Sequence, residues 1–395
     1  MSSRDRIALF LNALPMGGAE RNVLELSRFL SRSGHPVDLV LAEHRGELLR
    51  EIPSGVRVVD LEKRSRLETL AVLSSLPLAS FPDLAHLLFR NRLLTSLVPL
   101  RDYLQRERPR ALLTTITKNA LLALWARHLS GRELRVVVRE ANVFSRQHSS
   151  KAGRDNPILT RLARRWYPCA DVFVAVCHAV GDDLVDSVGV SRERIVTVHN
   201  PVDADRLAAA AREPLEHPWL RAGEPPVLLS VGRLTEQKDF PTLLRAFAIL
   251  RRERPARLLV LGEGRCRPQL EALCRELRIE DDVSFPGVVR NPQAFMARSA
   301  VFVLSSAWEG FVNVLLEALA CGCAVVSTDC TGGSAEILAG GRFGHLVGPG
   351  DPIGLAKSVG EALDHPADRE LLRGRAREFP PEAAFGHYRD ILLGG

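Results

Sequence analysis

Short runs of valine, leucine and isoleucine recur along the whole chain and alternate with segments whose apolar residues repeat with a helical period. The runs are continuous, which is typical of strands covered on both faces of a sheet. A chain that alternates such strands with helices folds into doubly wound parallel sheets. We predict strands at residues 7–11, 37–42, 56–61, 111–116, 135–139, 171–177 and 195–198, and again at 227–231, 257–261, 283–285, 301–304 and 324–328.

A stretch at residues 199–225, rich in proline, alanine and charge, separates two series of predicted strands. The chain has 395 residues, which is more than one ordinary domain and suits two. We therefore predict an α/β protein with two doubly wound, Rossmann-like domains, one over residues 1–200 and one over 201–375. Ligands of open parallel sheets bind at the carboxyl ends of the strands, so the two domains are expected to face each other across a binding cleft.

Positive charge is concentrated in the first half of the chain. Residues 1–205 hold 30 Lys and Arg against 23 Asp and Glu, a difference of +7, and the remaining residues hold 23 against 24, a difference of −1. This excess suits an anionic membrane surface, an acidic acceptor or a nucleic acid, and it equally suits a plain solvated surface. No zinc-finger spacing, aromatic RNA-binding motif or dense basic run favours nucleic acid.

The leucine-rich segment 67–104, which carries Arg90, Arg92 and Arg101, has two interpretations: an amphipathic helix pair at a membrane interface, or helices packed on the first sheet. The longest uncharged apolar stretch, 69–82, is shorter than the about 20 residues that span a bilayer. Seven cysteines without a C-x-x-C pair suit a reduced, cytosolic protein better than a disulfide scaffold or a zinc site.

Two glutamates eight positions apart mark the most specific motif of the second half. Glu309 lies in a loop after a predicted strand, and Glu317 lies about one and a half turns inside the next predicted helix. The helix begins over residues 310–314, where free backbone N–H groups bind anions and sugar hydroxyls. Glu309 can accept hydrogen bonds from ligand hydroxyls and Glu317 from a second diol. The alternative is a surface Glu309 and a capping Glu317.

The loop after the predicted strand at 227–231 carries Arg233 and Lys238, five positions apart. Both can reach one diphosphate, arginine through two parallel hydrogen bonds and lysine as a point charge. As a pair alone they are equally compatible with ordinary surface cations. In the first half, Gly17 and Gly18 follow the first predicted strand and open a helix, which lets the backbone approach a phosphate closely.

Taken together, these motifs resemble those of glycosyltransferase family 4, whose members have the GT-B fold. The most similar subgroup is the lipopolysaccharide-core type, which includes bacterial N-acetylglucosaminyltransferases. The resemblance covers nearly the whole chain and is strongest over 225–350. The matching segments are GGAERNVLELSRFL, VGRLTEQKDF, LGEGRCRPQLEAL and SSAWEGFVNVLLEALACGCAVVSTDCTGGSAEIL.

The resemblance implies a retaining transfer of a sugar from a nucleotide-sugar to an acceptor hydroxyl, in the synthesis of bacterial cell-surface polysaccharide or lipopolysaccharide. The donor expected from family frequency is a UDP-sugar. The first domain would bind a glycan or lipid-linked acceptor, residues 201–375 would bind the donor, and a helix within 376–395 would pack back on the first domain. Neither a metal nor another cofactor is implied. We expect a cytoplasmic enzyme that contacts the anionic inner face of the cytoplasmic membrane.

The same resemblance assigns roles to individual residues. Arg233 and Lys238 would act in catalysis by binding the diphosphate and stabilising charge on the leaving nucleotide. Glu309 would contact the donor sugar near its reactive face, and Glu317 would bind the ribose hydroxyls. Backbone amides that would hold the sugar and phosphate lie at Gly17, Gly18, Gly310, Phe311, Val312, Asn313 and Val314.

The sequence departs from the family pattern at two places. Val312 stands where the motif usually has proline, and the segment 114–119 lacks the histidine that many members carry after the fourth strand. The loop at 139–142 reads Arg-Glu-Ala-Asn, similar to the Ser-Glu-Arg-Asn type of this subgroup. Buried structural hydrogen bonding is the alternative role for residues of this loop and for Asn119. We assign the acceptor or sugar side to Asn119, Arg139, Glu140 and Asn142.

Three rival classes fit these motifs less well. A dinucleotide-dependent oxidoreductase needs G-x-G-x-x-G after a strand, and neither residues 17–18 nor residues 262–264 have that spacing. A metal-dependent GT-A transferase uses Asp-x-Asp, which Asp203 and Asp205 supply, but within the interdomain junction. A non-catalytic nucleotide-sugar-binding or assembly protein of the same fold is the alternative function, and the intact motif residues argue against it.

Overall fold

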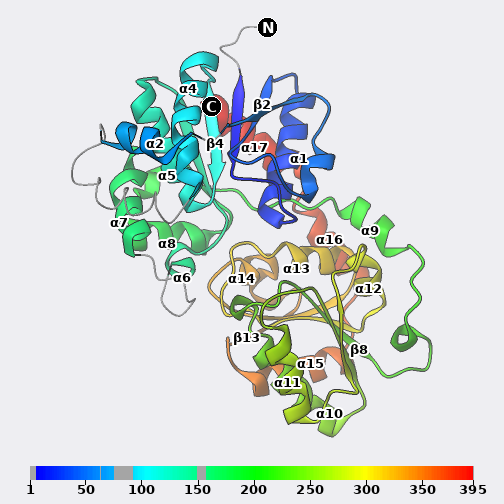
Figure 1. Cartoon of the computed structure of the whole chain (residues 1–395). Coiled ribbons are helices and arrows are strands. Elements are labelled where there is room, and N and C mark those ends of the chain that lie inside the picture. The colour runs from blue at the N-terminus through cyan, green and yellow to red at the C-terminus, as the bar shows by residue number, and fades with distance from the viewer. Residues whose placement is uncertain (1–5, 63, 75–91, 149–156, 395) are drawn as a thin grey trace. The chain divides into compact units, whose positions relative to one another are not determined.

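The computed structural model describes residues 6–62, 64–74, 92–148 and 157–394 (Figure 1). The chain divides into two compact units, Met1–His199 with Glu382–Gly395, and Asn200–Pro381. The predicted boundaries were residues 200 and 375. Each unit is built on one parallel sheet, so the predicted α/β architecture with two Rossmann-like sheets is confirmed.

The sheet of the first unit has seven strands in the order β3-β2-β1-β4-β5-β6-β7, and every pairing is parallel. All seven were predicted, and each end lies within two residues of its predicted position. Continuous branched runs identify such strands well because both faces are buried. The strands are β1 (Ile7–Leu11), β2 (Val37–Leu41), β3 (Val56–Asp60), β4 (Ala111–Thr115), β5 (Arg135–Glu140), β6 (Val172–Ala175) and β7 (Ile195–Thr197).

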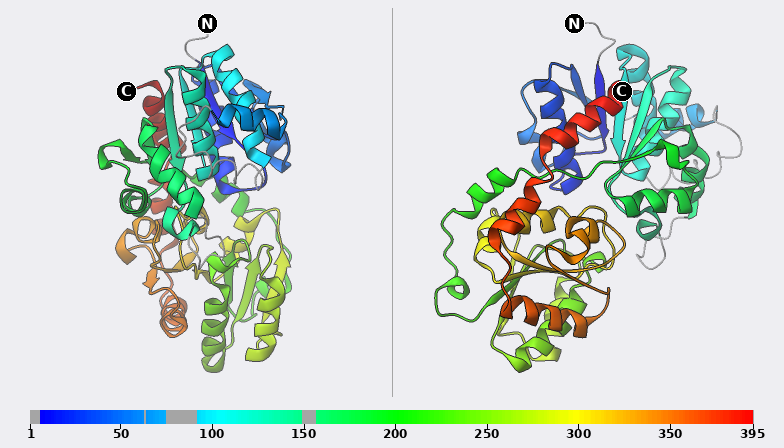
Figure 2. Two further views of the ribbon diagram at one scale, coloured as in Figure 1. Left: turned by 60° about the vertical axis from the view of Figure 1, so that its left-hand side comes forward. Right: turned by 180° about the vertical axis from the view of Figure 1, so that it is seen from behind.

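Alternate residues of β1 enter two different cores. Ala8 and Phe10 pack with α4, α5 and α7, whereas Ile7 and Leu9 pack with α1 and α17. Figure 2 shows α17, in red, on the side of the sheet that carries α1. The last helix of the chain therefore completes the core of the first unit. The helices of this unit are α1 (Gly18–Arg32), α2 (Arg66–Leu73), α4 (Leu97–Glu107), α5 (Thr117–Ser130), α6 (Phe144–Gln147), α7 (Pro157–Trp166), α8 (His178–Val188) and α17 (Pro381–Leu393).

The position of helix α4 distinguishes between the two interpretations of segment 67–104, a helix pair at a membrane interface or helices packed on the first sheet, for the part of the segment that α4 spans. Leu97, Leu100 and Leu104 are buried in the core beneath the first sheet, so this portion is packed on the sheet. Arg101 pairs with the adjacent Asp102 at 2.6 Å, while Arg90 and the side chain of Arg92 lie outside the described residues. Within the described parts of the chain, no helix combines the length and the apolar character needed to cross a bilayer.

The sheet of the second unit has six parallel strands in the order β10-β9-β8-β11-β12-β13. The first five were predicted, and the edge strand β13 was not, because it spans three residues and is only half-buried. The strands are β8 (Val227–Val231), β9 (Arg257–Leu261), β10 (Val283–Gly287), β11 (Val301–Leu304), β12 (Ala324–Thr328) and β13 (His345–Val347).

Helices cover this second sheet, and α10 contributes the largest share of its buried apolar core. Asp203, considered above as a metal ligand, instead caps α9, since its Oδ1 accepts a hydrogen bond from the Arg206 N–H at 2.9 Å. The helices are α9 (Ala204–Ala211), α10 (Phe240–Glu253), α11 (Arg267–Leu277), α12 (Pro292–Arg298), α13 (Asn313–Ala320), α14 (Ser334–Ile337), α15 (Pro352–Asp364) and α16 (Arg369–Arg377).

Candidate active site

Three glycines hold the loops together where neighbouring strands of the second sheet end. The Gly232 N–H donates to the Leu261 carbonyl at 2.9 Å, and the Gly262 N–H donates to the Gly287 carbonyl at 2.8 Å. Gly262 has φ +134°, and a Cβ there would collide with the Gly232 carbonyl. Only glycine fits such a close approach in this backbone conformation. The loop after β8 is thereby fixed against the loop after β9.

The loop after β8 carries Lys238 on a short 3₁₀ turn that leads into α10. The Lys238 ammonium nitrogen lies 2.6 Å from Oε1 of Glu309, which belongs to the loop between β11 and α13. Both side chains are largely withdrawn from solvent, with exposed fractions of 16% and 9%. Two residues predicted to act on the donor thus form an ion pair.

Glu309 accepts further hydrogen bonds that fix its carboxylate. Ser306 Oγ donates to Oε1 at 2.6 Å, and Gln237 Nε2 donates to Oε2 at 3.3 Å. Gln237 also joins the two loops through its backbone, because its carbonyl accepts from the Ala307 N–H at 2.8 Å. Ser305 Oγ donates to the Lys238 carbonyl at 2.8 Å. The loops after β8 and β11 therefore form one hydrogen-bonded unit around the ion pair.

A third loop, after β12, packs against the backbone of Glu309. The Glu309 N–H donates to the Thr331 carbonyl at 3.0 Å, and the Gly333 N–H donates to the Gly310 carbonyl at 2.8 Å. Gly332 has φ +147°, and a Cβ there would lie 2.6 Å from the Glu309 carbonyl oxygen. This glycine turn, noted in the sequence, has a steric reason in the close contact of two backbones.

The helix that follows Glu309, α13, begins at Asn313. The predicted anion-binding stretch 310–314 is thus the loop and first turn of this helix, where the Asn313 N–H donates to the Phe311 carbonyl at 3.1 Å and the Leu315 N–H to the Val312 carbonyl at 3.0 Å. Asn313 Oδ1 accepts from Asn200 Nδ2 at 2.8 Å. Glu317 lies one turn into α13, is half-buried, and its Oε2 accepts from Gln293 Nε2 at 2.8 Å.

Arg233, the other predicted diphosphate residue, differs from Lys238 in its surroundings. Its side chain is exposed, whereas the next residue, Leu234, is fully buried and anchors the loop. The structure therefore brings Lys238 and Glu309 into contact and leaves the Arg233 guanidinium at the surface of the same loop.

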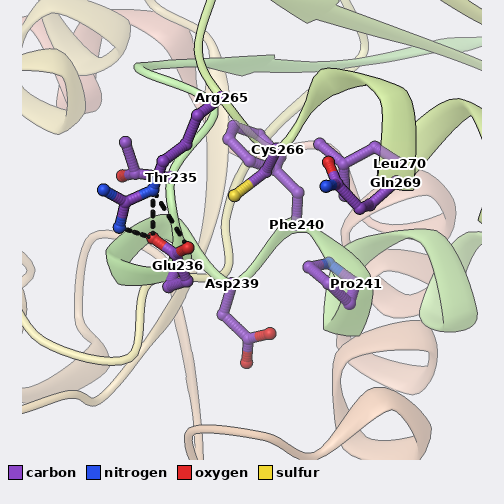
Figure 3. A pocket seen from close by; sticks show the side chains of 9 residues that line it. All are labelled: Thr235, Glu236, Asp239, Phe240, Pro241, Arg265, Cys266, Gln269 and Leu270. Atoms are coloured by element: carbon purple, nitrogen blue, oxygen red, sulfur yellow. Dashed lines mark hydrogen bonds and ion pairs between the residues drawn. The ribbon is translucent and has the colours of Figure 1, made fainter. Parts of the chain in front are cut away.

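Beside this loop lies a pocket of about 460 Å³ that sequence analysis did not find (Figure 3). Its apolar wall is formed by Phe240, Pro241 and Leu270, and an ion pair between Arg265 and Glu236 stands at its edge. Hydrogen bonding from Arg265 lowers the pKa of Glu236 to about 2. The pocket residues drawn in Figure 3 come from the turn before α10 and its first residues, and from the loop before α11 and its first turn.

In the first unit, Gly17 is the N-terminal flanking residue of α1, and Gly18 is its first residue. A Cβ on Gly17 would collide with the Glu20 carboxylate, which lies over the start of the helix. A negative charge at this position is stabilised by the helix dipole. The predicted backbone site therefore has an acidic side chain beside it, which the sequence did not lead us to expect.

The four predicted acceptor-side residues differ in their environments. Asn119 is buried and its Nδ2 donates to the carbonyl of Thr115, the last residue of β4, at 3.0 Å. Asn142 is half-buried and its Oδ1 accepts from the N–H of Val143 at 2.9 Å. Both bonds are local structural contacts of the kind given above as the alternative.

Arg139 and Glu140, at the end of β5, are buried in a polar cluster. Arg139 Nε donates to the hydroxyl of Tyr388 on α17 at 3.0 Å. Glu140 Oε1 accepts from the Tyr167 hydroxyl at 2.5 Å. Burial raises the pKa of Glu140 to about 7, against the opposing effect of the Tyr167 hydrogen bond. A carboxyl group that titrates near neutrality at the carboxyl edge of a sheet is a candidate functional group.

Two Rossmann-like parallel sheets in separate units are the architecture of the GT-B fold, which solved glycosyltransferase structures similar to this chain share. Sequence comparison agrees with this fold class. A family model described as "Glycosyltransferase Family 4" matches residues 16–206, and one described as "Glycosyl transferases group 1" matches residues 225–365. The chain belongs to glycosyltransferase family 4 and is an enzyme of the transferase class.

Individual relatives are similar along much or all of the chain. The N-acetylgalactosamine-N,N'-diacetylbacillosaminyl-diphospho-undecaprenol 4-alpha-N-acetylgalactosaminyltransferase of Campylobacter jejuni is 29% identical over 94% of each chain. The lipopolysaccharide core biosynthesis glycosyltransferase LpsE of Rhizobium meliloti is 33% identical over 55% of this chain and 63% of its own. The Anabaena protein Alr3699/HepE, solved in complex with UDP, has the same fold, with a TM-score of 0.73 at 18% identity over 99% of this chain and 100% of its own.

Proposed function

We propose that this enzyme transfers a sugar from a UDP-sugar to a hydroxyl of a glycan or lipid-linked acceptor, with retention at the anomeric carbon, in the synthesis of lipopolysaccharide or another bacterial cell-surface polysaccharide. The observation that carries the proposal is the ion pair of Lys238 and Glu309, held by three loops at the carboxyl edge of the second sheet. Ligands of open parallel sheets bind at such an edge.

In this proposal the donor diphosphate replaces Glu309 as the partner of Lys238. A diphosphate carries more negative charge than one carboxylate, so it competes well for the ammonium group. The exposed Arg233 guanidinium, on the same loop, binds the diphosphate with two parallel hydrogen bonds. The released Glu309 carboxylate, still held by Ser306, accepts hydrogen bonds from the hydroxyls of the donor sugar.

Glu317 is proposed to bind the ribose diol. It lies one turn inside α13, and its Oε2 accepts a hydrogen bond from Gln293 in the ligand-free protein. Two vicinal hydroxyls match the two oxygens of a carboxylate. Glu317 can therefore replace its hydrogen bond from the Gln293 side-chain amide with hydrogen bonds from the ribose. The first turn of α13 places backbone N–H groups toward the sugar and phosphate.

The proposed chemistry is a front-face displacement. The bond from the anomeric carbon to the diphosphate oxygen breaks, and the acceptor oxygen bonds to the same face of that carbon. The departing phosphate oxygen takes the proton of the acceptor hydroxyl, while Lys238 and Arg233 stabilise its charge. We propose that these cations do the work of a divalent ion, so activity should persist in EDTA. Loss of activity in EDTA with recovery in manganese would contradict this.

The relatives support the choice of substrates. The Campylobacter relative is named for an undecaprenyl-diphosphate-linked acceptor, LpsE for the lipopolysaccharide core, and HepE was solved with UDP. An acceptor of this kind sits at the inner leaflet, and each basic residue near an anionic surface contributes about 1 kcal/mol. We therefore propose a cytoplasmic enzyme bound peripherally to that surface. Sedimentation with anionic vesicles at low salt, and release at high salt, tests this part.

A donor panel tests the proposed function directly. UDP-, GDP- and ADP-sugars should be compared for thermal stabilisation, since a ligand at 100 times its Kd adds about 2.7 kcal/mol. UDP-sugars should stabilise the protein, and the same donors should then yield product with undecaprenyl-diphosphate-linked or lipopolysaccharide-core acceptors. Stabilisation without turnover on any acceptor would favour the non-catalytic binding protein.

A further inference from the structure

A chain of polar side chains runs through the carboxyl edge of the first sheet. The Tyr167 hydroxyl, fully buried, donates to Glu140 at 2.5 Å and also interacts with the hydroxyl of Thr117. Thr117 Oγ1 lies 3.0 Å from Nε2 of His148. Glu140 ends β5, Thr117 begins α5 and His148 follows α6, so three separate elements meet here. The chain leads from a buried carboxyl group to a half-buried imidazole.

The backbone is strained at the same place. Ile116, between β4 and α5, has φ +73°, a conformation that β-branched residues rarely adopt. Its neighbours hold it there: the Ala120 N–H donates to the Ile116 carbonyl at 3.0 Å, and Asn119 binds the Thr115 carbonyl. Strain of this kind persists where the surroundings over-determine it and is concentrated at functional sites. The Ile116 side chain is 37% exposed, so the turn reaches solvent.

The segment 114–119 contains no histidine, but His148 lies beside Thr117 of this segment in the folded protein. His148 comes from the loop after β5, and its ring packs on Phe144 with 4.6 Å between ring centres. The imidazole therefore has an apolar support on one side and a hydroxyl partner at Nε2. Side chains that are both packed and hydrogen-bonded have defined orientations, as a ligand-binding group requires.

We propose that His148 binds a hydroxyl group of the acceptor sugar at the carboxyl edge of the first sheet, and that Thr117, Tyr167 and Glu140 position its imidazole. The proposal rests on the proposed function for the identity of the ligand as an acceptor glycan. Carboxyl edges of parallel sheets are where ligands bind, and the strained Ile116 turn forms the exposed border of this one.

The hydroxyl of Thr117 links the protonation state of the His148 imidazole to that of the Glu140 carboxyl group. A neutral His148 with its proton on Nδ1 accepts the Thr117 O–H at Nε2, whereas the imidazolium donates N–H there, and the Thr117 hydroxyl then turns its proton toward Tyr167. That reversal changes the hydrogen bond that Tyr167 gives to Glu140. Burial and the charge of Asp183 raise the pKa of Glu140, while Tyr167 and Arg139 oppose this. Glu140 therefore titrates near pH 7, and the hydroxyls of Tyr167 and Thr117 connect it to the His148 imidazole.

The first test observes the imidazole without requiring turnover. In the full chain, His148→Gln assigns the His148 ring signal, and its titration is followed by NMR in wild type, Tyr167→Phe and Thr117→Val. Each of the last two removes one hydroxyl and keeps the shape of the side chain. We expect the His148 pKa to move by about half a unit or more in both variants. An unchanged His148 titration in both would overturn the positioning role.

The second test measures binding of the acceptor. Octyl N-acetyl-α-galactosaminide serves as the acceptor probe, with UDP as the donor-side probe. We expect His148→Gln to weaken the glycoside about tenfold, the value of one lost hydrogen bond, and to leave the UDP Kd within twofold. His128→Gln is the matched control, because His128 lies near the far end of α5 against Trp166.

The outcomes separate the two proposals. Equal weakening of glycoside and UDP by His148→Gln, or an effect no larger than that of His128→Gln, would overturn the acceptor role of His148. If UDP fails to bind wild type while the glycoside binds and depends on His148, the proposed donor is wrong and the His148 site stands.

Discussion

Lys238 and Glu309 lie 71 positions apart in the sequence, and their charged groups are 2.6 Å apart in the structure. Neither residue belongs to a helix of more than one turn, and both are held by backbone contacts between loops. A partly buried pair of this kind is costly to break from one side, since the remaining charge loses its partner. In the ligand-free enzyme each residue therefore keeps the other in a defined position.

Lys238→Ala should lower kcat by about a hundredfold or more, as expected for the loss of one preorganised electrostatic group. Arg233→Ala should act in the same direction. Steady-state rates with the active UDP-sugar provide the measurement. Lys357→Ala is the matched control, because Lys357 is 78% exposed on α15. Full activity of the Lys238, Arg233 double variant would show that the diphosphate binds elsewhere.

Glu317→Gln should mainly raise the KM for the donor, because a ribose contact is made equally in the ground and transition states. Glu309→Gln should mainly lower kcat, because the sugar contact lies nearer the reacting carbon. Initial rates over a donor concentration series distinguish these effects. The reverse pattern would mean that the two roles are exchanged.

Glu140→Gln should change the pH dependence of stability. The pKa of Glu140 is raised from about 4.5 to about 7 in the folded protein, so the folded state binds the extra proton between these values. Its contribution to stability therefore falls as pH rises from about 4.5 to about 7. Chemical denaturation should show that wild type loses more stability than Glu140→Gln between pH 5 and pH 8. Parallel curves for the two proteins would exclude this linkage.

Gly332→Ala should destabilise the second unit and reduce activity, because φ is +147° and the added Cβ would lie 2.6 Å from the Glu309 carbonyl oxygen. The loss should exceed about 1 kcal/mol in denaturant unfolding. Gly374→Ala is the control: Gly374 lies within α16 with open space around its Cα, so alanine should stabilise the helix by up to about 1 kcal/mol. Equal stability of the two variants would show that the loop relaxes without cost.

Strands and their ends were predictable where both faces are buried, as at β8 and β12, because continuous branched runs have no other good environment. The strand β13 was not predicted, since a strand of three residues, two of them only half-buried, carries too little pattern. The glycine loops and the charged residues of the second unit were predictable individually. Their pairing was not, because the contact of Lys238 with Glu309 depends on which strands are neighbours.

The candidate site of the first unit was less predictable from the sequence than that of the second unit. Arg139 and Glu140 were singled out from the residues at the end of β5, but Tyr388 and Tyr167, which bind them, come from distant helices. His148 was missed altogether. His148 lies beside Thr117 because of the path that the chain takes after β5, and the spacing of residues in the sequence does not predict this path.

The place of α17 bears on how this chain folds as it leaves the ribosome. Phe385, Tyr388 and Leu392 cover the face of the first sheet that also carries α1. The ring centres of Phe29, on α1, and Phe385, on α17, are 5.9 Å apart. The first 199 residues are synthesised first, but α1 alone covers only part of this face until residues 382–395 emerge. The second unit is continuous in sequence and can close its core earlier. A nascent chain stalled before α17 therefore exposes an apolar surface to chaperones, and the core of the first unit can be completed only after the whole second unit has been synthesised.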